Sequence, residues 1–186
     1  MRQYTIKIYP ENRLTILLFK NVTNTNEIKD GLQNGLWDWA VANCKPIFDH
    51  QQILIAATKS ISAFSESKKP ESFNINKDMI NRLSPSGNFA DSLTNFGLNA
   101  DDKEFFVFLM NATQEKIDQV KSNIKGEEID ISIETKNIYF NPDFAKKVYK
   151  ISDIELPNEL STSNNELYLE KLKGLIINNM AVKGLL

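Results

Sequence analysis

Residues 13–20 read RLTILLFK, and this stretch decides the fold. Its apolar side chains follow one another without the alternation of a half-exposed strand, a pattern that is typical of a strand covered on both faces. Before it, Tyr4, Ile6 and Ile8 alternate with polar residues, and the interval Pro10–Asn12 predicts a hairpin turn between the two segments. The chain is therefore expected to begin with a hairpin whose second strand lies centrally in a sheet.

Outside the hairpin, helical and strand patterns follow one another irregularly. Two further strands are predicted, at residues 36–44 (LWDWAVANC), with Trp37 and Trp39 on one face, and at residues 105–110. Apolar spacings of three and four residues, with Asn, Asp, Thr or Ser at the first position, predict helices. These span residues 24–34, 49–66, 74–83, 88–96, 113–124, 141–151 and 163–182, and residues 152–165 form a polar connection before the last helix. The order lacks strict βαβ units and favours one α+β domain over residues 1–186, with a central, mostly antiparallel sheet flanked by helices.

Two features of the predicted helices concern their ends and faces. Gly97 follows the helix at residues 88–96 and is expected to end it in the left-handed conformation. The last helix carries an apolar surface wider than one stripe, from Leu167 to Met180. This surface predicts either contact with a partner or burial in a groove of the same domain.

Composition excludes several classes of protein. The 186 residues carry 22 basic and 24 acidic side chains, so the net charge of -2 produces no overall field that would attract nucleic acid or a membrane. No apolar run reaches the ~20 residues that span a bilayer, and the start MRQYTIKIYP lacks the apolar core of a signal peptide. The single cysteine, Cys44, rules out an intramolecular disulfide and fits a reducing compartment. The expected location is the cytoplasm and nucleus.

Residues that could carry a reaction are sparse. There is one histidine, His50, and one cysteine, so neither a metal site nor a nucleophile with an oriented base is evident. No glycine-rich phosphate-binding loop occurs, and the pairs Asp101–Asp102 and Glu127–Glu128 are interpreted as solvated turns. The sequence therefore predicts a protein that is not an enzyme and that needs no cofactor or metal. A small enzyme that uses Cys44 or His50 is the alternative.

Basic side chains gather at two places on the predicted helices. Lys146, Lys147 and Lys150 share one helix, with Tyr149 beside them, and Lys59, Lys68 and Lys69 lie towards the end of another. These lysines are candidates for contact with the phosphates of a nucleic acid, which would position it without reading its sequence. The alternative is a solvated helix face. A stand-alone RNA-binding protein is a further alternative, and it predicts salt-sensitive affinity for RNA.

Residues 83–98 (LSPSGNFADSLTNFGL) combine a Leu-Ser-Pro turn with a helix that ends in Asn-Phe-Gly-Leu. Three other segments lie before and after it, at residues 14–20 (LTILLFK), 49–59 (DHQQILIAATK) and 146–152 (KKVYKIS). In their order and spacing, these four motifs resemble the kinase-binding (TPRKB-like) family of subunits of the KEOPS/EKC complex. The resemblance covers most of the chain.

The resemblance implies a non-catalytic accessory subunit that binds the small lobe of a PRPK-like atypical kinase/ATPase. That complex makes threonylcarbamoyladenosine beside the anticodon of tRNAs that read ANN codons. Archaeal relatives are also implicated in holding the 3′ CCA end of tRNA. The expected partners are therefore the kinase subunit, the other KEOPS subunits indirectly, and tRNA.

The kinase-facing surface is expected on the turn and helix from Ser86 to Leu93 and on exposed apolar residues of the last helix. For Phe89, Leu93 and Phe96, a place in the core is the alternative, which is favoured for Phe96. The candidates for kinase contact are Ser86, Asn88, Phe89, Asp91, Leu93, Ile176 and Met180, and those for tRNA contact are Lys59, Lys146, Lys147 and Lys150.

Overall fold

The strand β2 (Tyr9–Lys20) lies inside an antiparallel sheet in the computed structural model of the chain. It pairs on one side with β4 (Phe105–Met110) and on the other with β1 (Arg2–Ile6) and, further along, with β5 (Glu127–Ile129). β3 (Ala40–Asn43) pairs with β4, which gives the order β1-β2-β4-β3. The predicted α+β class with a mostly antiparallel sheet is confirmed. The structure describes residues 1–68, 70–131 and 139–182.

The sheet has an apolar core on each face because the apolar run in β2 has almost no polar alternation. Leu14, Ile16 and Leu18 point into one core, and Leu17 and Phe19 point into the other. The side chains of β4 divide between the two cores in the same alternating manner. Each fully buried aliphatic or aromatic side chain contributes about 1.5–3 kcal/mol, so these two central strands anchor both layers of helices.

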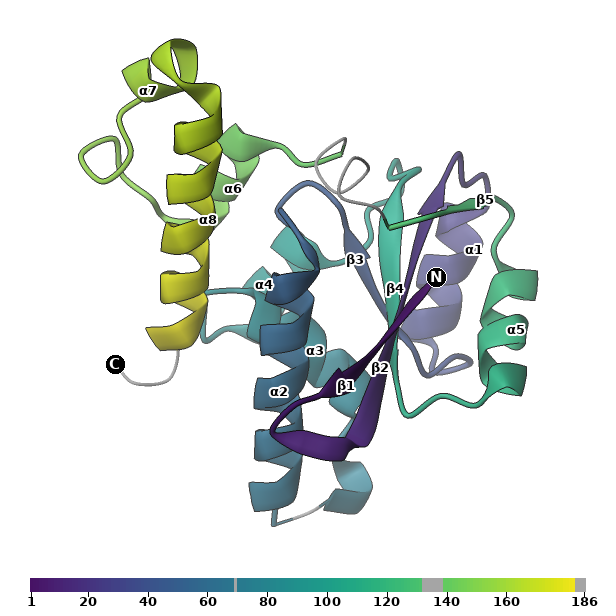
Figure 1. Ribbon diagram of the computed structural model, residues 1–186. Coiled ribbons are helices and arrows are strands. Elements are labelled where there is room, and N and C mark those ends of the chain that lie inside the picture. The colour runs from purple at the N-terminus through teal and green to yellow at the C-terminus, as the bar shows by residue number, and fades with distance from the viewer. Residues whose placement is uncertain (69, 132–138, 183–186) are drawn as a thin grey trace.

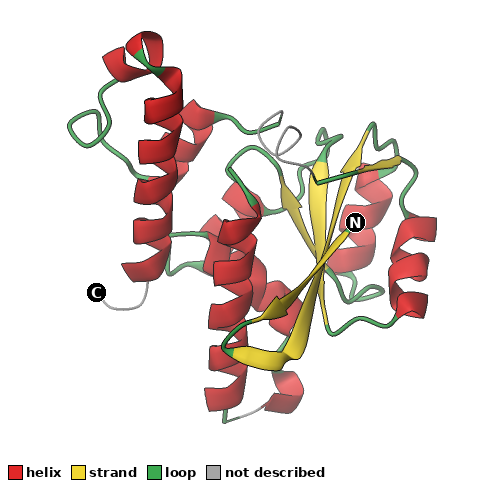
Figure 2. Ribbon diagram, in the orientation of Figure 1, coloured by secondary structure: helices red, strands yellow, loops and turns green. Residues whose placement is uncertain are grey.

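Helices cover both faces of the sheet (Figure 1). α1 and α5 lie on one face and α2, α3 and α4 on the other, while α6, α7 and α8 form a further group beyond α2 (Figure 2). α8 packs on both α6 and α2. The helices are α1 (Thr25–Gln33), α2 (His50–Glu66), the 3-10 helix η1 (Pro70–Ser72), α3 (Ile75–Leu83), α4 (Phe89–Phe96), α5 (Gln114–Asn123), α6 (Pro142–Tyr149), α7 (Glu159–Ser163) and α8 (Asn165–Val182). In the described part of the chain, no helix combines the length and the apolar character that crossing a membrane requires.

Several helices begin with side-chain caps that the sequence predicts, whereas Asn24 makes no cap bond to α1 and α8 begins at Asn165, two residues after the predicted Ser163. Asp49, Asn88 and Thr113 each accept a hydrogen bond from a backbone N–H group in the first turn of the helix that follows. At Asp49 the side chain of Gln52 also reaches back to the backbone, which completes a capping box. These local bonds explain why the starts of α2, α4 and α5 were predictable from sequence alone.

The N-terminal hairpin turns earlier than the sequence predicts. The turn lies at residues 7–8, and Pro10–Asn12 belongs to β2. The register between β1 and β2 shifts between Thr5 and Ile6, so the pairing is irregular near the turn. A proline, which has no N–H group to donate, is tolerated at such a bulge.

Three other segments differ from their predicted form. The strand predicted at residues 36–44 is confined to β3, and Trp37 packs over Gly31 so closely that a Cβ there would lie 2.5 Å from the indole ring. Glu127–Glu128, predicted as a solvated turn, belongs to β5, and the Glu128 carboxylate pairs with the N-terminal ammonium at 2.7 Å. The polar connection before the last helix contains the short helix α7.

Gly97 ends α4 for a different reason from the one predicted. Its backbone is extended, with φ -67° and ψ 174°, and is not left-handed. The Gly97 N–H group donates to the Leu93 carbonyl at 2.9 Å. A Cβ on Gly97 would overlap this carbonyl oxygen, so glycine is required by the close approach of the backbone.

Candidate binding groove

An open groove with a volume of about 520 Å³ lies where α1, α3 and α4 meet β3. Ala40 and Val41 line it from β3, Trp39 lines it from the segment just before β3, Leu32 lines it from α1, and Ile80 lines it from α3. No described strand pairs with the outer edge of β3, so the sheet ends at this groove. A concave and mainly apolar surface of this size is the usual form of a binding site.

Phe89 and Leu93 stand at the mouth of the groove, about one helical turn apart on α4. They remain 43% and 46% exposed, whereas Ser92 and Phe96 on the other side of the helix are buried. The structure thus confirms Phe96 as a core residue and places Phe89 and Leu93 outside the core. Two large apolar side chains left in water on one helix face are typical of a contact surface.

The polar residues before α4 organise the start of the helix. The Ser86 hydroxyl donates to Asp91 Oδ2 at 3.1 Å and accepts from the Asn88 N–H group at 3.1 Å. Asn88 Oδ1 in turn accepts from the Ala90 N–H group at 2.8 Å. Three of the predicted kinase-contact residues therefore fix the direction in which α4 leaves the turn, and with it the direction of its exposed apolar face.

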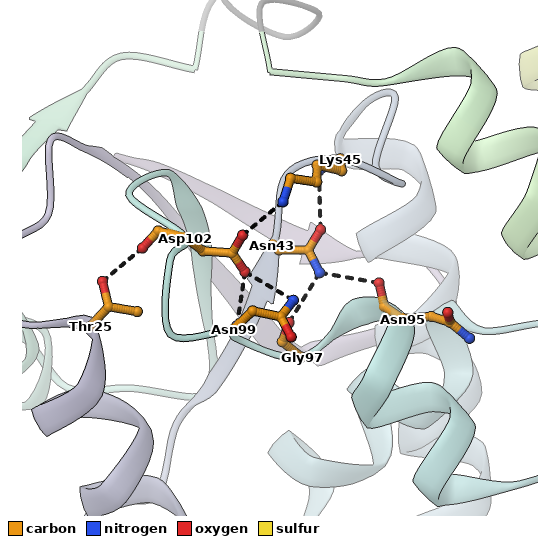
Figure 3. Close-up of polar contacts among 7 residues, drawn as sticks. All are labelled: Thr25, Asn43, Lys45, Asn95, Gly97, Asn99 and Asp102. Atoms are coloured by element: carbon orange, nitrogen blue, oxygen red, sulfur yellow. Dashed lines mark hydrogen bonds and ion pairs between the residues drawn. The ribbon is translucent and has the colours of Figure 1, made fainter.

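Asn43, at the end of β3, ties the end of α4 to the sheet (Figure 3). Its Nδ2 donates to the carbonyl oxygens of Asn95 at 3.1 Å and of Gly97 at 3.0 Å. Its Oδ1 accepts from the Lys45 N–H group at 3.2 Å. Asn43 is only 1% exposed, so solvent has little access to replace these bonds. Because Gly97 lines the groove, Asn43 holds one of its walls in place.

Asp102 anchors the loop between α4 and β4 in the same network (Figure 3). Its Oδ2 accepts from the Asn99 N–H group at 2.8 Å, and its Oδ1 pairs with Lys45 Nζ at 3.0 Å. Its backbone carbonyl accepts from the Thr25 hydroxyl at 2.7 Å. The interpretation of Asp102 as solvated surface is wrong, since it is 5% exposed, whereas its neighbour Asp101 is exposed as predicted.

Neither Asn43 nor Asp102 was among the residues predicted to shape a site. A sequence signal exists for Asn43, because it closes the otherwise apolar strand AVAN and a buried amide at such a position needs hydrogen-bonding partners. Asp102 has no comparable signal, because adjacent carboxylates in a polar segment are usually solvated.

Replacing Asn43 with alanine is expected to lower the free energy of unfolding by about 2 kcal/mol, because two carbonyl groups lose a buried donor. Urea denaturation of the purified chain measures this change. Asn95→Ala is the matched control, since the hydrogen bond uses the backbone carbonyl of Asn95, and it should unfold close to the native midpoint. Identical midpoints for the native chain and Asn43→Ala would contradict the anchoring role.

The last helix contributes its predicted contact residues to the core. Tyr168, Leu172, Ile176 and Met180 form one stripe of α8 at four-residue spacing, and all four are buried. They belong to the core that α2 and α6 share. The expectation that Ile176 and Met180 lie on an exposed surface is wrong, and burial against the same domain accounts for this stripe.

The four lysines predicted to contact tRNA differ in their surroundings, and Lys69 of the second basic group lies outside the described residues. Lys146 is buried, and its Nζ pairs with Asp153 at 2.7 Å and donates to two further oxygens. Lys59 donates to backbone carbonyls at the C-terminal end of α8. Lys147 and Lys150 are exposed. Lys146 would have to leave a satisfied buried site to reach a phosphate, and contact of the exposed lysines with tRNA stays a prediction.

Cys44 and His50 give the catalytic alternative no support. Burial, reinforced by the carboxylates of Glu104 and Asp102, raises the pKa of the Cys44 thiol well above its usual value. A raised pKa keeps the thiol protonated, whereas a nucleophile requires the thiolate. The His50 ring stacks on Tyr4 with 5.0 Å between the ring centroids. Within the described residues, no three His, Cys, Asp or Glu side chains gather as a metal site requires.

The chain is thus an α+β protein with an exposed apolar groove, framed by a buried polar network, that is a candidate site for a binding partner. Comparison with known proteins narrows this class. A family model described as kinase binding protein CGI-121 matches residues 19–184. The chain therefore belongs to this family, which confirms the resemblance found from the four motifs between residues 14 and 152.

Its relatives are named as subunits of one complex. The chain is 29% identical over 154 residues to the EKC/KEOPS complex subunit TPRKB of Danio rerio, a match that covers 81% of this chain and 85% of that protein. It is 23% identical over 184 residues to the EKC/KEOPS complex subunit CGI121 of Candida glabrata, covering 98% and 99% of the two chains. The corresponding subunit of Candida albicans is 27% identical over 169 residues, covering 78% and 82%.

Proposed function

We propose that the chain is a non-catalytic subunit of an EKC/KEOPS complex. In this role it binds a PRPK-like atypical kinase/ATPase through its groove and supports threonylcarbamoyladenosine modification of tRNAs that read ANN codons. The family description and the names of the relatives support the kinase and the complex as partners. The observation that carries the assignment to the groove is the exposed pair Phe89 and Leu93 at its mouth.

Burial of this pair would supply a useful part of the binding free energy. A fully buried Leu or Phe side chain contributes about 1.5–3 kcal/mol relative to an exposed one, and both side chains here are already half covered. The pair is therefore worth roughly 2–3 kcal/mol, or about a hundredfold in Kd. A few apolar anchors of this kind commonly dominate an interface, with near-neutral contacts around them.

The groove is arranged to bind without a large rearrangement. α4 has 8 residues, and a helix this short is marginal in isolation. It is held by its cap at Asn88 and by the bonds from Asn43 to its last turn. Because these contacts exist before binding, less conformational freedom is lost on association. A rigid groove of this kind would support the kinase by binding one arrangement of its small lobe better than others.

Co-expression with the matching kinase subunit tests the proposal. We expect the two chains to co-purify as one complex on size-exclusion chromatography. We also expect tRNA modification by a reconstituted complex to fall when this chain is left out. Separate elution at micromolar concentrations would contradict kinase binding, and full modification without the chain would contradict the supporting role.

A further inference from the structure

The groove carries positive charge on two of its walls. Lys29 of α1 and Lys77 of α3 both line it, and the lining residues described include no Asp or Glu. This is unexpected in a chain with 24 acidic and 22 basic side chains. Within the described residues, neither lysine takes part in an ion pair.

The carboxylates close by on α3 and α4 are engaged elsewhere. Asp78 pairs with Arg82 at 3.0 Å, one turn further along α3. Asp91 accepts a hydrogen bond from Ser86 on the outer side of α4. Neither carboxylate lines the groove. Asp38, which directly precedes the lining residue Trp39, accepts hydrogen bonds from Asn74 and Asn76 at the start of α3. No carboxylate belongs to the lining itself, so the two ammonium groups there would attract an incoming anion.

The apolar lining favours a polypeptide over a nucleic acid. Nucleic-acid bases bind single-strand sites chiefly by stacking on exposed aromatic rings. The aromatic residues of the lining are Phe89 and Trp39, and Trp39 is buried, which leaves one accessible ring. The remaining apolar residues are aliphatic, among them Leu32, Ile80 and Leu93. Such a lining fits an inserted apolar side chain better than a stacked base.

From this combination we infer that the groove takes an acidic-apolar polypeptide segment of the kinase subunit. One apolar side chain of the segment inserts beside Leu93 and Ile80, and carboxylates that flank it pair with Lys29 and Lys77. The inference rests on the proposed function and specifies the chemistry of the surface that the partner presents. It also separates two contributions: the apolar side chain supplies most of the affinity, and the charges supply orientation and association rate.

Reversal of both charges tests the inference with the purified kinase subunit as the probe. Solvent-exposed ion pairs are individually weak, so we expect Lys29→Glu with Lys77→Glu to weaken Kd roughly tenfold to thirtyfold, mainly through slower association. The matched control reverses two exposed lysines outside the groove, Lys7→Glu with Lys171→Glu, and should bind like the native chain. Biolayer interferometry resolves the association and dissociation rates.

Salt dependence gives a second measurement. Raising the ionic strength shortens the range of exposed charges, so the native association rate should fall as NaCl is raised from roughly 50 to 500 mM. The Lys29→Glu, Lys77→Glu variant should lose most of this dependence. A variant that keeps the native association rate and the native salt dependence would overturn the inference.

Zero-length cross-linking with a carbodiimide gives a direct readout, because it joins a lysine only to a carboxylate in contact with it. In the native complex we expect mass spectrometry to find Lys29 or Lys77 joined to Asp or Glu of the kinase. A complex that forms but gives no such cross-link would overturn the inference that an acidic segment occupies the groove, and it would leave the proposal of kinase binding intact. Displacement of the kinase by a short single-stranded oligoribonucleotide, lost in the charge-reversed variant, would assign the groove to nucleic acid instead. Failure of the native chain to bind the kinase at all would overturn both proposals.

Discussion

Leu93→Glu is expected to weaken binding of the kinase subunit by roughly thirtyfold or more while the free chain stays folded. Leu93 is 46% exposed at the mouth of the groove, so its replacement removes little from the core. Glutamate also suits a helix almost as well as leucine. In the complex, however, the carboxylate would sit in a desolvated apolar contact, where a hot-spot replacement costs about 2–4 kcal/mol or more.

Isothermal titration with the kinase subunit measures this loss, and circular dichroism confirms that the variant keeps its helix content. Ala90→Glu is the matched control: it places the same charge on the same helix at an exposed residue that does not line the groove. Ala90→Glu should bind within a few-fold of the native chain. Native affinity in Leu93→Glu, with its fold intact, would move the kinase interface away from this groove.

The layered fold could be predicted because its signals are local. The apolar runs in β2 and β4 each indicate a strand that is buried on both faces. Capping residues such as Asp49 indicate where a helix begins to within one turn. The structure of residues 36–39 could not be predicted in the same way. Their alternation indicates a strand, but Trp37 packs on Gly31 in the preceding helix. Pairing with β4 therefore begins only at Ala40, the first residue of β3.

The framework of the groove could be predicted only in part, because its polar bonds join distant segments. Asn43 and Gly97 are 54 positions apart, and Thr25 and Asp102 are 77 positions apart. Nothing within a short window of sequence distinguishes these side chains from solvated ones. Phe89 could be proposed as a contact residue from its motif and helical position. Its exposure could not be settled, since the same spacing also describes a core helix.

Lys146 shows the same limit for charged residues. Its neighbours in sequence suggest a basic, solvated helix face. The structure turns it inward, because Asp153 and the segment that follows fold back over α6 and supply oxygens for its three donors. Burial of a lysine is tolerated when its charge is paired and its donors are satisfied. Not every lysine of a cluster seen in the sequence is therefore exposed and able to contact a phosphate.

The apolar width of α8 is explained by the number of elements that surround it. Its stripe of four buried residues meets the core between α2 and α6, and Leu169 and Leu175 beside the stripe are partly buried against the same core. Lys173 pairs with Asp49 at 2.6 Å and fastens the helix to the start of α2. From its periodicity alone, the apolar face of α8 could meet either a partner or the rest of the domain. The structure shows that the domain itself covers most of it.

Ile176→Glu is accordingly expected to act on folding, with a loss of about 3–5 kcal/mol in the free energy of unfolding, because it buries an unpaired charge. Ile176 has no exposed surface and lies in the middle of the buried stripe. In a chain of this length, such a loss lowers Tm by roughly 6–20 °C. Differential scanning calorimetry measures the shift.

Asn178→Glu, two residues along on the exposed side of α8, is the matched control and should unfold near the native temperature. The pair also separates two explanations for any loss of kinase binding. Binding by Ile176→Glu should recover at temperatures where the variant is folded, because the side chain does not face the partner, whereas Leu93→Glu should stay defective at every temperature. A variant Ile176→Glu with the native Tm and no kinase binding would instead make α8 part of the interface and contradict its burial in the core.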